Sequence, residues 1–194
     1  MRKGTLIASL CWIAHLASFA ALGKGIHSFA GPFIIYISAV NDCKDVNSPI
    51  VTHRTRFSHF NPRRPFDKQT LSGNITVPVP IDDTWWGSIT LDIRSNNQWK
   101  SNAFIFNITQ HFCSAMRKNV PGYFHAAFGL DPNSKAPCLI PNGTHTFKDE
   151  PVSWDPPNVP IMPYGFYRSH NVGGVGRHMH ACYLTECHII PKPT

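Results

Sequence analysis

Residues 85–94 read WWGSITLDIR and form the most regular stretch of the chain. Ile89, Leu91 and Ile93 alternate with polar residues, and this period of two predicts a strand with one buried and one wet face. After a polar turn, residues 104–108 (FIFNI) alternate again. We therefore expect the two stretches to pair as an antiparallel hairpin.

Similar signals recur on both sides of this hairpin. Residues 32–40 (PFIIYISAV) form an apolar run, and further strand-like stretches lie at 73–79, 144–147, 164–170 and 177–190. Pro78 and Pro80 suit an edge strand or a strand end. Half-apolar sheets must bury one face against another layer. The pattern therefore predicts an all-β, two-layer sandwich.

One segment has a helical period. Phe112, Ala115 and Met116 recur at helical spacing, and Pro121 is expected to close this one short helix. Residues 123–130 then read as an aromatic loop. Such a loop suits either a lid or a rim that touches membranes.

The composition excludes two other classes of protein. Of 194 residues, 42% are hydrophobic, 12% aromatic and only 15% charged. A disordered chain would be richer in charge and poorer in aromatic residues, and a coiled coil would need apolar heptads. The length suffices for one domain with its own core.

The N-terminus predicts secretion. Arg2 and Lys3 precede an uncharged apolar stretch at 6–22, and small residues follow at signal-peptidase spacing. We expect residues 1–23 to be a signal peptide and residues 24–194 to form the mature domain. The alternative, an uncleaved membrane helix, is disfavoured because the stretch is only weakly apolar, and no later segment is long enough to span a membrane.

Secretion changes the arithmetic of charges and cysteines. Loss of Arg2 and Lys3 leaves 16 basic against 11 acidic residues, so the net charge of +7 becomes +5. Cys11 is also lost, and the five remaining cysteines allow at most two disulfides within the chain. Three N-glycosylation sequons become meaningful, at Asn74, Asn107 and Asn142.

Catalytic signatures were not found. The chain contains no nucleophile elbow, zincin motif, P-loop or dinucleotide fingerprint. Asp82 and Asp83 are neighbours whose side chains should point apart in an extended chain. The glycines at 173–176 suit a flexible hairpin loop. We expect no enzyme and no cofactor.

Two further patterns allow a functional and a plain interpretation. His178, His180 and Cys182 share one face of a strand, but a disulfide would remove the thiolate, so we expect no metal. Basic residues gather between 54 and 68. They suit anionic head groups or, as we favour, a solvated loop; they are Arg54, Arg56, Arg63, Arg64 and Lys68. Nucleic acid is a poor partner for such a chain.

A series of ordered motifs carries a family resemblance. Phe112-Cys113 is followed by Cys138, by residues 140–144 (IPNGT) and by residues 162–168 (MPYGFYR). The series resembles a large arthropod family of secreted proteins related to the ML lipid-recognition superfamily and to the ganglioside activator protein. The insect chemosensory B proteins are close relatives in that family. The similarity extends from about residue 42 to 186.

The resemblance implies an immunoglobulin-like β-sandwich with a lipid cavity between its sheets, and binding without catalysis. It also implies a disulfide between Cys113 and Cys138. Cys182 and Cys187 would face opposite sides of a strand because their spacing is odd. We therefore expect Cys43 to pair with one of them, without deciding which.

Candidate walls of this cavity are aromatic residues and methionines. They are Phe104, Phe106, Phe112, Met116, Phe124, Phe128, Trp154, Met162, Tyr164 and Phe166. The plain alternative is that each belongs to the core. The expected function is therefore binding of a lipid or another apolar molecule, such as a pheromone, fatty acid, sterol or glycolipid. The alternative is an extracellular co-receptor module that has a filled core and binds a cell-surface receptor.

Overall fold

The computed structural model describes residues 29–43 and 50–193. Antiparallel strands make up most of this part of the chain, which confirms the all-β prediction. The predicted signal peptide, including Cys11, lies outside the described residues. None of the helices within the described ranges is long and apolar enough to cross a membrane.

The larger sheet has five strands in the order β2-β12-β11-β6-β7. They are β2 (Phe33–Asp42), β6 (Trp85–Ser95), β7 (Gln98–Ile108), β11 (Gly165–Val175) and β12 (His178–Pro191). β6 and β7 form the predicted hairpin, in which Leu91 pairs with Phe104. β7 is an edge strand, so one of its sides is unpaired.

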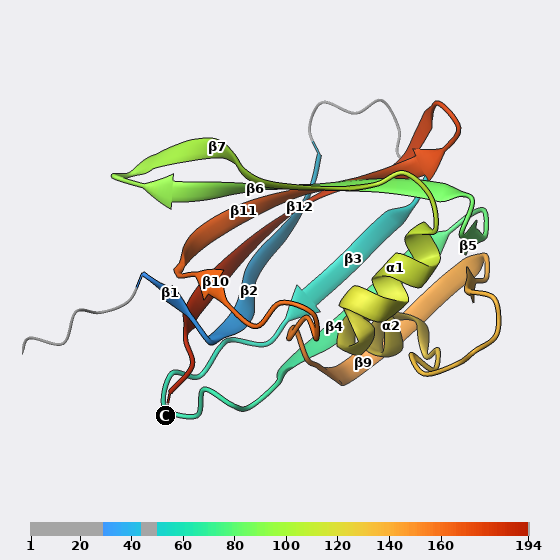
Figure 1. The fold of residues 1–194 in the computed structure, drawn as a ribbon. Helices are drawn as coiled ribbons and strands as arrows, with labels where there is room; N and C mark the ends of the chain where they lie inside the picture. The colour runs from blue at the N-terminus through green and yellow to red at the C-terminus, as the bar shows by residue number, and fades with distance from the viewer. Residues whose placement is uncertain (1–28, 44–49, 194) are drawn as a thin grey trace, which may run out of the picture.

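The smaller sheet has three strands in the order β3-β4-β9 and lies beneath the larger one in Figure 1. They are β3 (Thr52–Phe57), β4 (Gln69–Val77) and β9 (Gly143–Val152). Two short pairs complete the strands: β1 (Ala30–Gly31) with β10 (Met162–Pro163), and β5 (Ile81–Asp82) with β8 (Leu139–Ile140). Together the two sheets form the predicted sandwich.

A single buried amide joins the two sheets. Gln69 on β4 is 5% exposed. Its side chain accepts a hydrogen bond from the backbone N–H of Ile37 (2.7 Å) and donates to the carbonyl oxygen of the same residue (2.9 Å). β2 is the edge strand of the larger sheet, so backbone groups on its open side are available for such bonds. A bulge lies beside Ile37, opposite Glu186 and Cys187 of β12. The amide also donates to Ser58, so its polar atoms are satisfied.

Two helices lie between the sheets (Figure 1), where one helix and an aromatic loop were predicted. α1 (Phe112–Asn119) contacts β6, and α2 (Pro121–Phe128) contacts β9 and β4. α1 ends at Asn119, just before Pro121, as predicted, but the loop expected after it is wrong. Pro121 begins α2, because the first helical position needs no N–H donor, and Gly129 ends α2 in the left-handed conformation.

The apolar core consists of two clusters. The first surrounds Trp85 and Phe124 near the helices, and the second surrounds Tyr167 and Ile189 near β1 and β10. Phe57 and Trp154 pack against both clusters and connect them.

Two disulfides close long loops. Cys113 bonds to Cys138, as the resemblance implied, and Cys43 bonds to Cys182. The second bond decides between the two partners that the sequence left open. Cys187 is free and lies in the second cluster with 8% of its surface exposed.

Two local predictions are wrong. The solvated basic loop was expected to include Arg54 and Arg56, but both lie on β3 with exposed side chains. The glycine-rich loop was expected at 173–176, but Gly173 and Gly174 lie in β11, and the turn begins at Gly176. A Cβ atom on Gly174 would lie 1.9 Å from the carbonyl oxygen of His178, so close strand packing requires glycine there.

Burial predicts the reactivity of the free thiol. Burial raises the pKa of Cys187 to about 12, so the reactive thiolate is scarce at neutral pH. We expect iodoacetamide to alkylate Cys187 only after unfolding, while the four bonded cysteines react only after reduction. Peptide mapping by mass spectrometry measures this order. Alkylation of Cys187 in the native protein at the rate of a free thiol would contradict the packing.

Candidate functional site

The inner face of the β6–β7 hairpin is only partly covered. Leu91 and Ile93 on β6 and Phe104 on β7 share the face of the buried Tyr167, yet all three keep accessible surface. Phe106, two residues after Phe104 on the same face, is 45% exposed. In Figure 1 the turn end of this hairpin projects beyond the smaller sheet. The apolar side chains on this inner face are therefore not fully covered by the smaller sheet.

The N-terminal end of α1 closes the opposite end of this face. The Phe112 ring packs directly on the backbone of Gly87. A Cβ atom added to Gly87 would lie only 2.3 Å from this ring. Gly173, on the neighbouring strand β11, also faces this ring. The two glycines thus make room for the helix between the sheets.

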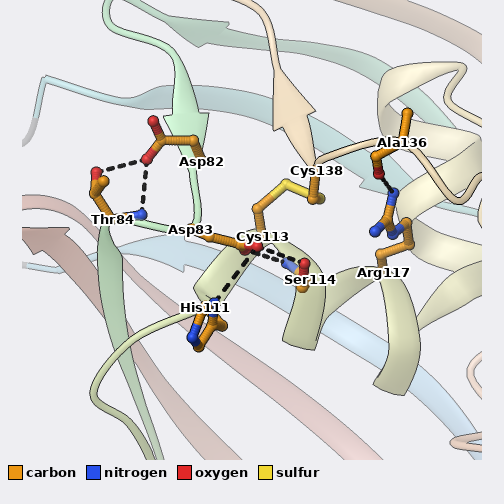
Figure 2. Close-up of polar contacts among 9 residues, drawn as sticks. All are labelled: Asp82, Asp83, Thr84, His111, Cys113, Ser114, Arg117, Ala136 and Cys138. Carbon is orange, nitrogen blue, oxygen red and sulfur yellow. Dashed lines mark hydrogen bonds and ion pairs between the residues drawn. A yellow bond between two sulfur atoms is a disulfide. The ribbon is translucent and has the colours of Figure 1, made fainter.

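Two acidic neighbours diverge at the start of α1, as Figure 2 shows. Asp82 accepts a hydrogen bond from the backbone N–H of Thr84 (2.9 Å). Asp83 instead accepts from the backbone N–H (2.8 Å) and hydroxyl (2.6 Å) of Ser114. His111, at the N-cap position, makes no side-chain cap, so Asp83 caps the helix from a distant part of the sequence.

Asp83, His111 and Ser114 are the residue types of a hydrolase triad, but they are not arranged in the order that a triad requires. In a triad, histidine lies between the carboxylate and the nucleophile. Here the Ser114 hydroxyl donates to Asp83 Oδ2 directly, and the Nδ1 atom of the exposed His111 ring lies 3.6 Å from the same oxygen. The geometry is that of a helix cap.

The Cys113–Cys138 disulfide anchors the same helix. It ties α1 to the segment before β8, and Arg117 donates a hydrogen bond to the carbonyl oxygen of Ala136 (2.9 Å) in that segment (Figure 2). The position of α1 between the sheets is thus fixed at both its first and last turns.

Polar side chains occupy the region between the two apolar clusters. On β11 and β12, Ser169, Asn171, Tyr183 and Thr185 share the face of Tyr167 and Cys187. Asn171 accepts from the Ser169 hydroxyl (2.9 Å) and donates weakly to Thr185 (3.4 Å).

The smaller sheet and α2 add further polar groups to this region. His53 on β3 contacts the Tyr183 ring edge-on, with ring centroids 5.6 Å apart. Tyr123 on α2 stacks on Trp154, with centroids 5.7 Å apart. We call Tyr123, Tyr183, His53, Ser169, Asn171 and Thr185 the polar band.

Burial shapes the ionisation of the polar band. Burial raises the pKa of the Tyr183 hydroxyl, and it raises the pKa of Tyr123 with a smaller contribution from Tyr183. Burial lowers the pKa of His53, opposed by the Asp42 carboxylate 3.3 Å from its ring. These three groups are therefore neutral at pH 7.

The predicted wall residues fall into three groups. Phe112, Met116, Phe124 and Phe128 pack in the first cluster, Phe104, Met162 and Tyr164 in the second, and Trp154 in both. Phe106 extends the exposed inner face beside Phe104. Phe166 lies on the outer face of the larger sheet, where it stacks on His188 with centroids 4.4 Å apart and contacts Trp99. Phe166 therefore does not face the region between the sheets.

The remaining candidates lie on the surface or in the disulfide. Asn107 and Asn142 are exposed, whereas Asn74 is half-buried on the central strand of the smaller sheet. His178 and His180 stack with centroids 6.3 Å apart, and Cys182 is bonded to Cys43. Within residues 29–43 and 50–193, no group of three or more metal-binding side chains is present.

Two hollows lie on the surface of the described part of the chain. The first contains no residue of the polar band, and the second contains only His53 of the band. One, of about 430 Å³, lies between α2 and β9 and is lined by His125, Phe128 and His145, among others. The other, of about 660 Å³, lies beside β3 and is lined by Asp42, His53 and Asn74, among others. Neither contains the exposed inner face of the β6–β7 hairpin.

The comparison with known families covers the centre of the chain. Residues 87–169 match DUF1091, a family described as proteins of unknown function. The match spans most of β6, all of β7, both helices, the Cys113–Cys138 disulfide and β9. No curated protein matches the chain.

The polar band was missed by sequence reasoning. Ser169 and Asn171 alternate with larger residues in β11, as do Tyr183 and Thr185 in β12. Polar residues in such alternation are usually assigned to the wet face. The neighbouring Tyr167 and Cys187, which share their parity, were the available signal for an inward orientation.

The cap at Asp83 gives a pH-dependent prediction. Burial opposes ionisation of Asp83, but hydrogen bonds from Ser114 and His111 outweigh it and lower its pKa below the ordinary value. Its stabilising effect is therefore complete above the unfolded pKa and disappears as the pH falls through the lower, folded pKa. Asp83→Ala should cost about 1 kcal/mol at pH 7 and less at pH 3.

Urea denaturation at the two pH values measures this difference. Asp67→Ala is the control, since Asp67 is exposed and its side chain pairs only with the exposed Arg64, and its cost should stay within about 0.5 kcal/mol. A loss for Asp83→Ala that matches the control would show that the carboxylate does not cap α1.

Proposed function

We propose that this chain is a secreted protein that binds a lipid or other apolar small molecule between its two sheets. The observation that carries the proposal is the inner face of the β6–β7 hairpin. Leu91, Ile93, Phe104 and Phe106 keep accessible surface on the side that a sandwich normally buries. A ligand chain placed there would bury this surface, at about 0.8 kcal/mol per CH₂ group.

Three further features support the proposal. The ordered motifs around Cys113, Cys138 and residues 162–168 resemble the ML lipid-recognition superfamily. The two disulfides and the signal-like N-terminus suit an oxidising, extracellular compartment. The family matched at residues 87–169 has no assigned function and is silent on the ligand.

The co-receptor alternative has less support. A co-receptor module of this kind would bind its receptor through an exposed aromatic rim, for which residues 123–128 are the candidate segment. Those residues form α2, in which Phe124 is 2% exposed and Tyr123 stacks on Trp154. The aromatic side chains thus face the protein interior.

Native purification tests binding directly. We expect organic extraction of the secreted protein, followed by mass spectrometry, to release a lipid in stoichiometric amount. The purified, delipidated protein should then bind N-phenyl-1-naphthylamine, a neutral fluorescent apolar probe. An empty extract together with no probe binding would refute the carrier function.

A pair of neighbouring substitutions locates the site. Phe104→Asp places a charge on the inner face of β7 and should weaken probe binding at least about tenfold, because a ligand cannot hydrate the buried carboxylate. Ile105→Asp is the matched control, since Ile105 lies on the outer face of the same strand and is 53% exposed. Circular dichroism confirms that both variants fold. Equal effects on binding would place the ligand elsewhere.

A further inference from the structure

The open side of β7 carries none of the residues that usually protect the edge of a sheet. β7 is the last strand of the larger sheet, and within the described residues it pairs with β6 alone. Residues 101–110 (SNAFIFNITQ) contain no charged residue and no proline. Two apolar side chains are exposed on this stretch, Ile105 at 53% and Phe106 at 45%. An open edge of this kind is a template on which another strand can add.

The other three edges of the larger and smaller sheets are each protected. On β2, the Gln69 side chain occupies the backbone N–H and carbonyl groups of Ile37. β3 exposes Arg54 and Arg56, and β9 exposes the charged and proline residues 148–151 (KDEP). Charges and prolines are the usual means by which natural proteins prevent strands from adding at an edge. β7 therefore differs from the other edges of these two sheets in the described part of the chain.

The sequence of this edge suits pairing with a second copy of the chain. When a strand pairs antiparallel with its own copy about a two-fold axis, a charge near the axis meets a like charge. Residues 101–110 avoid this repulsion because they are uncharged. With the axis at Ile105, this side chain faces its own copy on the outer face, and Phe104 faces Phe106 on the inner face. Aromatic and β-branched pairs of this kind stabilise neighbouring strands.

The geometry of β7 limits the length of such a pairing. Its ladder with β6 is regular from Ile108 to Phe104 and shifts before Lys100. Asn102 has a positive φ of 60°, which departs from regular strand geometry. The segment available for pairing is therefore 103–107, and the nearest cation along the strand, Lys100, lies outside it.

We propose that two copies of this protein form a dimer by antiparallel pairing of residues 103–107 of β7 about an axis at Ile105. The pairing joins the larger sheets of the two copies into one continuous sheet and closes both open edges, so the assembly stops at two copies. It places the inner faces of the two β6–β7 hairpins side by side without covering either. The inference is therefore independent of the ligand, and its failure would leave the proposed function intact.

Sedimentation equilibrium on the full chain expressed in insect cells tests the dimer. Asn107 belongs to an expected glycosylation sequon on the outer face of the paired segment, where its Oδ1 atom accepts a hydrogen bond from the Ser88 hydroxyl (2.7 Å). The Asn107→Gln variant removes any glycan from the strand pair and serves as the parent protein. We expect this parent to sediment with twice the mass of one chain in the micromolar range. A monomeric parent overturns the assignment.

A charge at the axis tests the interface. In the Asn107→Gln parent, Ile105→Lys places two lysines opposite each other and should weaken dimerisation at least about tenfold, because an apolar pair is replaced by like charges. Ile161→Lys is the matched control, since Ile161 is 58% exposed and lies outside the larger sheet. It should leave the dimer unchanged. Equal losses for the two variants would place the interface elsewhere and overturn the assignment.

A mixture of opposite charges tests the register. An equimolar mixture of Ile105→Lys and Ile105→Asp should form a heterodimer more tightly than either variant forms its own dimer, because the axis places the two substituted side chains opposite each other. A mixture that dimerises no better than the separate variants overturns the axis at Ile105.

Amide hydrogen exchange tests the strand pair itself. In the parent protein, exchange of residues 103–107 should slow as the protein concentration rises, because the second copy protects the open backbone groups of β7. The Ile105→Lys variant should show no such dependence. Exchange of this segment that is equally fast at all concentrations of a dimeric parent overturns pairing through β7.

Discussion

The hydrogen bonds between Gln69 and the backbone of Ile37 hold the two sheets together along one edge of the sandwich. They hold β4 of the smaller sheet against β2 of the larger one at a bulge. The helices stand between the sheets farther along, so the layers cannot close over their full width. The β6–β7 hairpin, at the opposite side of the larger sheet from β2, is consequently only partly covered. One satisfied buried amide and one pair of helices thus explain why an all-β core leaves apolar wall exposed.

Local patterns predicted most of the strands because their burial follows a period of two. The alternation of Ile89, Leu91 and Ile93 is enough to place the β6–β7 hairpin. The role of Pro121 was not predictable in the same way, since proline suits both the end of one helix and the start of the next. Only the packing of Phe124 against the first cluster decides that a second helix follows. The strand β3 was not predicted because its inner side chains are His53, Thr55 and Phe57, of which only Phe57 is apolar.

The residues of the candidate site could not be predicted from the sequence of any single strand. Phe166 and Tyr167 are neighbours with opposite orientations, and an aromatic residue in either position fits the sequence pattern of a cavity wall. Their assignment follows only from the register of β11 against β12, since a shift of one residue exchanges the two faces. The polar band likewise requires residues from β3, α2 and β12 to meet, and such meetings are set by tertiary packing.

The ligand-free protein carries an unfavourable feature at one side of the sandwich. Apolar side chains of the β6–β7 hairpin remain in contact with water. A ligand that lays its hydrocarbon along this face removes that cost. Because such a ligand binds the folded state alone, its binding free energy adds to the stability of the fold by mass action. The Cys113–Cys138 disulfide and the Asp83 cap hold α1 in place without it, which keeps this side of the site formed before the ligand arrives.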